Sequence, residues 1–167
     1  FALRSMLATT FVMTRGYASS DTEAAFNHAR SLGQSAASPE DYFRTQFGSW
    51  VFYTAKGDHN AGLRRMAEIA TIARRGDGTS LQFPALVSRM CTAVYQAEFD
   101  EANSAGKEIM DVYKVEVHSG MADMWFHDPK MLAHIFTAHA WWIKGFPDQA
   151  LEASVEGVAY ARNLKRP

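Results

Sequence analysis

A short turn recurs four times along the sequence, and this repetition restricts the chain to a narrow set of folds. The turn segments are TRGYAS, AKGDHN, YQAEFD and IKGFPD, and their central residues, Gly16, Gly57, Ala97 and Gly145, lie 41, 40 and 48 residues apart. A helical pattern precedes and follows each turn, and glycine at a helix end accepts the left-handed conformation that closes it. A period near 40 residues is typical of stacked helical hairpins, because one hairpin alone cannot bury both of its apolar faces.

Hydrophobic periodicity and caps define the helices between these turns. Ser20 with Glu23 has the spacing of a capping box, while Ser38 and Asp128 each precede a proline at a first helical position. The segment 113–127 lengthens the third interval, and we expect it to be a packed connection. The pattern predicts helices over residues 2–15, 20–33, 39–56, 60–75, 80–96, 99–113, 129–144 and 147–164.

The sequence therefore predicts an all-α protein, a right-handed superhelical solenoid of about four helical hairpins that forms a single domain over residues 1–167. The chain does not begin with methionine, and we expect it to be a fragment of a longer protein. Its 17 basic and 18 acidic residues are spread along the chain, so neither nucleic acid nor a membrane is an expected partner. The single cysteine, Cys91, fits a reducing compartment and predicts a cytoplasmic location.

The last forty residues carry a resemblance to a known family. The motif HDP at 127–129, then Ala138, Ala140 and Trp142, then GFPDQAL at 145–151 resemble the tetratricopeptide-like region of bacterial predicted signalling ATPases that are associated with adenylate or guanylate cyclase domains. The segments GSWVFYTAKGD and ARNLKRP add to the resemblance, which implies tetratricopeptide-like hairpins and a role in bacterial signal transduction. The chain has no G-x-x-x-x-G-K-[ST] loop and no cyclase motif, so the family's ATPase and cyclase activities are not expected here.

Three histidines and an aspartate lie close together in the sequence. His127, Asp128, His134 and His139 could serve a metal-dependent hydrolase, which is the least favoured alternative. His134 and His139 are five residues apart, so they project about 140° apart around a helix. Asp128 is explained by its capping position, and Cys91 has no recognisable catalytic partner. We therefore expect no enzyme activity, no catalytic residue, no metal and no cofactor.

The first helices of the hairpins are expected to line a concave, apolar groove. The favoured function is a non-catalytic interaction or regulatory scaffold that binds a protein or peptide segment, or another domain of its parent chain. The alternative is a sensor that binds a small ligand in the same groove. Packing of these side chains against one another also stays open. Equivalent positions before each turn place in the groove Phe47, Val51, Thr54, Val87, Cys91, Val94, Ile135, His139 and Trp142.

The last predicted helix has two apolar faces. Leu151, Val155 and Val158 form one stripe, which needs a cover because terminal repeats normally present a polar outer face. We expect the chain either to pair as a two-fold dimer through this stripe or to belong to a longer array. The other face carries small residues that allow close approach to the preceding helix, among them Ala150, Ala153, Gly157 and Ala161.

Overall fold

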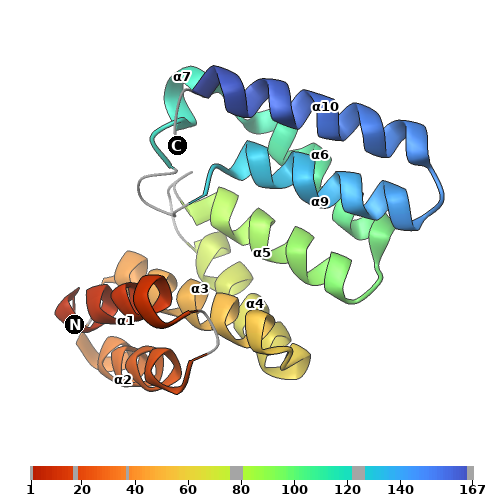
Figure 1. Ribbon diagram of the computed structural model, residues 1–167. Coiled ribbons are helices and arrows are strands. Elements are labelled where there is room, and N and C mark those ends of the chain that lie inside the picture. The colour runs from red at the N-terminus through yellow and green to blue at the C-terminus, as the bar shows by residue number, and fades with distance from the viewer. Residues whose placement is uncertain (1, 17–18, 37, 76–80, 122–126, 165–167) are drawn as a thin grey trace. The chain divides into compact units, whose positions relative to one another are not determined.

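The computed structural model describes residues 2–16, 19–36, 38–75, 81–121 and 127–164. Every regular element in these ranges is helical and no strand occurs in them, which confirms the all-α class. No helix in the same ranges combines the length and the apolar character that crossing a bilayer would require. The chain divides into two compact units, residues 1–81 and 82–167 (Figure 1). The expectation of a single domain stays a prediction.

The first unit consists of two helical hairpins. One pairs α1 (Ala2–Arg15) with α2 (Ser20–Ala36), and the other pairs α3 (Pro39–Lys56) with α4 (His59–Arg75).

Packing in this unit depends on close contact between α2 and α3. A Cβ atom added at Gly48 of α3 would lie 2.1 Å from the Cε1 atom of Phe26 on α2, so only glycine permits this approach. Phe26 belongs to a buried cluster with Ala8, Ala25 and Phe52. The first helix of the second hairpin is therefore seated on the first hairpin.

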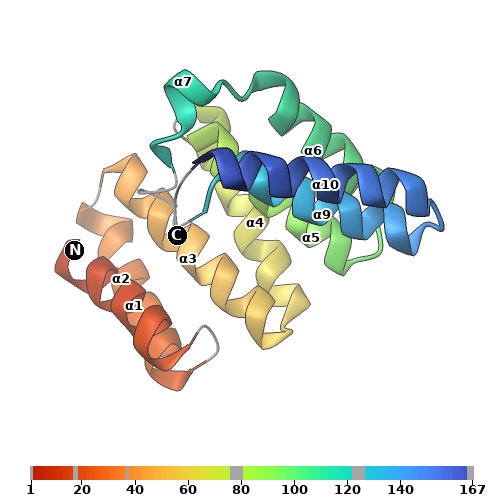
Figure 2. The same ribbon diagram turned by 45° about the horizontal axis from the view of Figure 1, so that its top comes forward.

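The second unit repeats this arrangement. The helices α5 (Gln82–Tyr95) and α6 (Phe99–Val112) pair with each other, and α9 (Pro129–Ile143) pairs with α10 (Pro147–Leu164). A short helix, α7 (Val115–His118), follows α6. Helix α9 packs against both α5 and α6, and α10 lies along its other side, as Figures 1 and 2 both show.

All eight predicted helices are present, and their ends agree with the prediction to within three residues. The short helix α7 was missed. It lies in the segment 113–127, which was expected to be a packed connection without regular structure, and residues 122–126 of that segment lie outside the described residues. Four helical residues are too few to show a hydrophobic period, so the sequence offered no signal for α7.

Two of the three predicted caps are confirmed. The Ser38 hydroxyl accepts a hydrogen bond from the Asp41 amide at 3.2 Å, and the Asp128 carboxylate accepts one from the Met131 amide at 3.0 Å. The prediction for Ser20 is wrong by one residue, because the hydroxyl of Ser19 accepts the Thr22 amide at 3.2 Å. Glu23 pairs instead with Lys56, 2.9 Å away on α3. Both serines carry the hydroxyl that a cap needs, so backbone geometry decides between them.

The four predicted turn residues all adopt the left-handed conformation. The φ angles of Gly16, Gly57, Ala97 and Gly145 are 89°, 79°, 61° and 85°. Ala97 is the one residue other than glycine with positive φ among the described residues. Its Cβ atom makes that conformation unfavourable, so the turn between α5 and α6 carries strain that the other three avoid.

Replacing Ala97 with glycine should therefore stabilise the second unit. We expect Ala97→Gly to raise the free energy of unfolding by about 1 kcal/mol, and the matched control Gly145→Ala to lower it by a similar amount. Urea unfolding followed by circular dichroism measures both. If both substitutions shift the midpoint in the same direction, the strain at Ala97 is not real.

Candidate functional site

The structure separates the residues that were predicted to line one groove. Phe47, Val51 and Thr54 are half-buried on α3 in the first unit. In the second unit Val87 and Cys91 are each only 4% exposed, so neither presents a surface to a ligand, and including them was wrong. Burial also raises the pKa of the Cys91 thiol, which keeps it protonated and unreactive.

The other predicted groove residues of the second unit have more varied positions. Val94 is half-buried against the cluster of Ala93, Ala102 and Ala140. Ile135 and Trp142 are 42% and 67% exposed on α9. A groove that would join these residues to those of the first unit stays a prediction.

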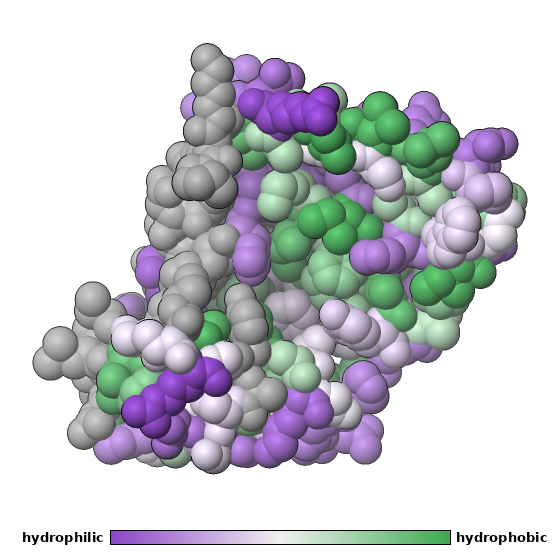
Figure 3. Space-filling view, in the orientation of Figure 1, coloured by the Kyte–Doolittle hydropathy of each residue, from purple (hydrophilic) through white to green (hydrophobic). Residues whose placement is uncertain are grey.

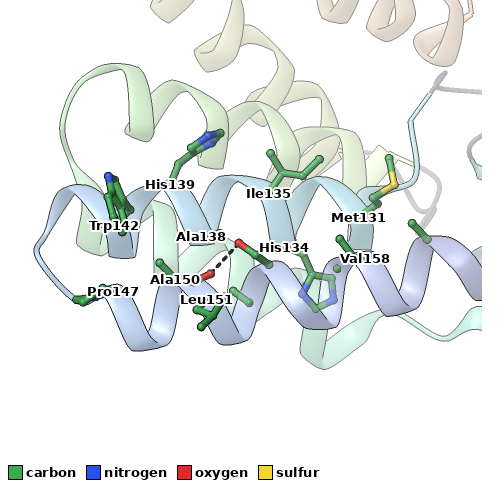
Figure 4. Close-up of a pocket in the computed structure, with 14 residues that line it drawn as sticks. Met131, His134, Ile135, Ala138, His139, Trp142, Pro147, Ala150, Leu151 and Val158 are labelled. Atoms are coloured by element: carbon green, nitrogen blue, oxygen red, sulfur yellow. Dashed lines mark hydrogen bonds between the residues drawn. The ribbon is translucent and has the colours of Figure 1, made fainter.

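A cavity of about 540 Å³ opens between α9 and α10. Figure 4 shows that its walls come from these two helices alone. Helix α9 contributes Met131, His134, Ile135, Ala138, His139 and Trp142. The cavity therefore combines three residues predicted for the concave groove with the terminal helix that was predicted to need a cover.

Most of the side chains that α10 contributes to the cavity wall are small. Its three larger lining residues are Pro147, Leu151 and Val158, of which Leu151 and Val158 are 63% and 51% exposed. Apolar surface gathers over α9 and α10 in Figure 3. The small lining residues are Ala150, Ala153, Ser154, Gly157 and Ala161.

The small residues of α10 let the two helices approach closely. A Cβ atom added at Gly157 would lie 2.8 Å from the Cβ atom of His134, so α10 passes directly over α9 at this point. The Ser154 hydroxyl donates to the Ala150 carbonyl oxygen at 2.8 Å, the bond dashed in Figure 4. The cavity floor is thus apolar, and its one hydroxyl already has an acceptor.

Val155 extends the exposed apolar surface of α10 without lining the cavity. It is 60% exposed, comparable with Leu151 and Val158. The stripe expected from the sequence is therefore on the surface, and pairing of two copies through it stays a prediction.

A buried hydrogen-bonded cluster fixes the end of the hairpin that is far from its turn. Asp128 is 4% exposed, and its Oδ2 atom accepts hydrogen bonds from the hydroxyls of Tyr113 and Tyr160, the latter at 3.1 Å. The Tyr160 hydroxyl also lies 3.1 Å from that of Tyr113. Burial and these hydrogen bonds raise the pKa of Tyr113. The carboxylate thus joins the end of α6, the start of α9 and the last turns of α10.

The four residues of the metal alternative do not converge. Asp128 is occupied by the cap and the two tyrosines, and His134 and His139 point in opposite directions from α9 in Figure 4. Burial lowers the pKa of His127 and of His134. No group of three or more metal-binding side chains occurs within the described ranges.

Sequence reasoning missed two parts of this site. Met131, Ala138 and Ser154 line the cavity, but their residue types are equally common in helix cores. Tyr113 and Tyr160 lie 47 residues apart in the sequence and meet only through the tertiary fold. The proline after Asp128 was the one local signal, and it predicted the cap alone.

No protein-family model, no curated protein and no solved structure matched this chain. The resemblance to the tetratricopeptide-like region of signalling ATPases therefore stays a prediction.

Removing the Asp128 carboxylate should destabilise the second unit. Asp128→Ala deletes the cap of α9 and removes the acceptor of the buried Tyr113 hydroxyl and of the half-buried Tyr160 hydroxyl, so we expect a loss of roughly 2–4 kcal/mol. Tyr160→Phe removes one hydrogen-bonding group and should cost about 1 kcal/mol. Urea unfolding checks both values, and an Asp128→Ala protein as stable as the parent would contradict the role given to the cluster.

The lowered pKa of His134 predicts a dependence of stability on pH. Burial is the main cause, while Glu156, 3.9 Å away, and Asp128 oppose it and Lys130 adds to it. The folded state therefore binds a proton less readily than the unfolded state, whose imidazole titrates near 6.5. Stability should fall as the pH drops below 6.5 and level off below the pKa of the folded state.

The test compares the parent with His134→Gln. Unfolding midpoints at pH 7.5 and pH 5 should differ less in the variant, because one of the groups that protonate on unfolding is gone. Direct titration of the His134 imidazole by NMR provides an independent check. A value at or above the unperturbed one would contradict the effect of burial.

Proposed function

We propose that this chain is a non-catalytic interaction module. In this proposal its hairpins are tetratricopeptide-like and stack as a right-handed superhelical solenoid, and the module binds a protein segment or another domain of a cytoplasmic signalling ATPase. The observation that carries the proposal is the open apolar cavity between α9 and α10, where large side chains remain exposed. Exposed apolar surface of this kind marks interaction sites in soluble proteins.

The repeated seating of helices supports the same proposal. In each unit the first helix of the second hairpin packs on both helices of the hairpin before it. Stacked hairpins that are related in this way build solenoids, whose long surfaces bind other proteins. Among the described residues no such helix packs on the α9–α10 hairpin, and the cavity lies on this hairpin.

Three candidate reactive residues of the second unit, one lining the cavity and two outside it, offer little to catalysis. His139 is exposed, and its ring lies 6.3 Å from that of Phe136. The thiol of Cys91 is buried, and the carboxylate of Asp128 is held by hydrogen bonds. A nucleophile beside an oriented base, the arrangement that covalent catalysis needs, is not formed by these groups.

One observation favours a second candidate function. A cavity of about 540 Å³ falls in the size range of small-molecule sites. The aromatic ring of Trp142 and the imidazole of His139 at one end would supply the few polar and aromatic contacts that such sites use. A sensor of small apolar ligands is therefore the alternative to the interaction module.

The two functions are separated by parallel binding screens. The protein is screened against displayed peptide segments, and a thermal-shift assay is run with a panel of metabolites and metal ions, since a ligand of the folded state raises the melting temperature. We expect peptide binders and no metabolite shift. A metabolite that raises the melting temperature, with that shift lost in Trp142→Ala, would favour the sensor.

The matched control is a neighbouring residue of α9. Trp142→Ala should weaken a peptide binder at least about tenfold, because aromatic anchors dominate interface energies. Ile143→Ala should leave affinity unchanged, since Ile143 is 59% exposed but does not line the cavity. Equal effects of the two substitutions would contradict binding at this site.

A further inference from the structure

A helix of this chain already fills one hairpin face. Helix α9 packs on both α5 and α6. Its Thr137 sits so close to Gly106 that a Cβ atom added there would lie 2.3 Å from the Thr137 Cγ2 atom. Its Ala140 joins Ala102 in a buried cluster, against which Val94 also packs. The face formed by α5 and α6 is therefore covered by an α-helix.

The groove between α9 and α10 is the equivalent face of the next hairpin. The left-handed turn residues Ala97 and Gly145 are 48 positions apart, which sets the register between the two hairpins. Four residues of α5 and α6 that contact α9 or pack in or against the Ala140 cluster have counterparts 48 positions later that line the groove: Val94, Phe99, Ala102 and Gly106 correspond to Trp142, Pro147, Ala150 and Ser154. The counterpart of Ala93, Trp141, does not line it.

Side chains on the α5–α6 face, which α9 covers, are less exposed than their counterparts in the α9–α10 groove. None of the residues that lie 48 positions before the groove-lining residues is exposed. In the groove itself Ile135 is 42% exposed, whereas its counterpart Val87 is 4% exposed. Trp142 is 67% exposed, whereas its counterpart Val94 is half-buried. The groove thus has the form of a hairpin face without its helix.

The floor of the groove also indicates which side chains would fill it. Ala138 and Gly157 stand where the α5–α6 face carries Met90 and Ile109, both fully buried. Because Ala138 and Gly157 are smaller than Met90 and Ile109, the α9–α10 groove is deeper than the α5–α6 face on which α9 packs. An occupant would therefore have to bring longer side chains than the threonine and alanine that α9 directs at its own seat.

We propose that this groove binds an amphipathic α-helix of a partner protein, seated as α9 is seated on α5 and α6. The helix directs leucine, isoleucine or methionine side chains at the floor formed by Ala138 and Gly157. From Met131 to Trp142 the α9 wall runs for about 17 Å, so about 12–16 residues of helix cover it. This inference rests on the proposed interaction function and names the partner of the same site.

The probe is a displayed library of 16-residue amphipathic peptides. Four positions spaced three or four residues apart vary among alanine, serine, leucine, isoleucine and methionine, and the remaining positions carry glutamate and lysine. Selection on the whole protein should enrich long aliphatic residues at the two central positions. NMR spectra of the protein with a selected peptide should show the largest shifts at the Trp142 indole and the Ser154 amide.

Two valines on α10 form a matched pair of variants. Val158 lines the groove and Val155 does not, and the two are 51% and 60% exposed. Val158→Glu places a charge under the seated helix and should weaken a selected peptide at least about tenfold, while Val155→Glu should change its affinity less than about twofold. Because both side chains are largely exposed, both variants should fold, which circular dichroism verifies.

Three results would overturn the inference. Enrichment of alanine and serine at the central positions would contradict the claim that long side chains fill the space above Ala138 and Gly157. Peptides that bind equally well to Val158→Glu, with NMR shifts elsewhere, would leave the interaction function intact but move it to another surface. A free protein that sediments as a dimer, and becomes a monomer with Val158→Glu, would make a second copy the occupant.

Discussion

Each hairpin of this chain depends on one backbone residue held in the left-handed region. Gly16, Gly57, Ala97 and Gly145 reverse the chain within a few residues, so the two helices that each one joins must lie against each other. Helices that lie so close need small residues where they touch. Glycine provides this at Gly106 and Gly157, where a Cβ atom would collide with a side chain of the neighbouring helix. The turn chemistry and the small residues on the helix faces are therefore two parts of one constraint.

That constraint also explains why similar residues have different environments in successive hairpins. The α5–α6 face is covered by α9, and Cys91 is buried in it, whereas His139 at the equivalent position of the next hairpin is exposed. What packs on a hairpin face decides which apolar side chains become core and which remain on the surface. No described helix packs on the α9–α10 face that carries the cavity, and its apolar side chains stay exposed there.

Local features could be predicted from the sequence, and features that depend on distant contacts could not. The turn at Gly57 and the cap at Ser38 follow from the chemistry of a few neighbouring residues. Exposure could not be predicted, because Val87 and Ile135 occupy the same register position and differ only in what packs on them. The cluster of Asp128 with its two tyrosines joins three helices, and hydrophobic periodicity within one helix does not predict contacts between distant helices. The cavity was anticipated in part, since Leu151 and Val158 were recognised as needing a cover.

The hydrogen bonds of Tyr160 have a consequence for the groove that runs along α10. A helix that is open along one face is prone to local unfolding, and an unfolded wall would have to become ordered when a partner arrives. The Tyr160 hydroxyl ties the last turns of α10 to Asp128 and Tyr113, so this wall is held in place in the free protein. Preorganisation of this kind lowers the conformational entropy that binding must overcome, and a partner of modest contact area can then bind with useful affinity.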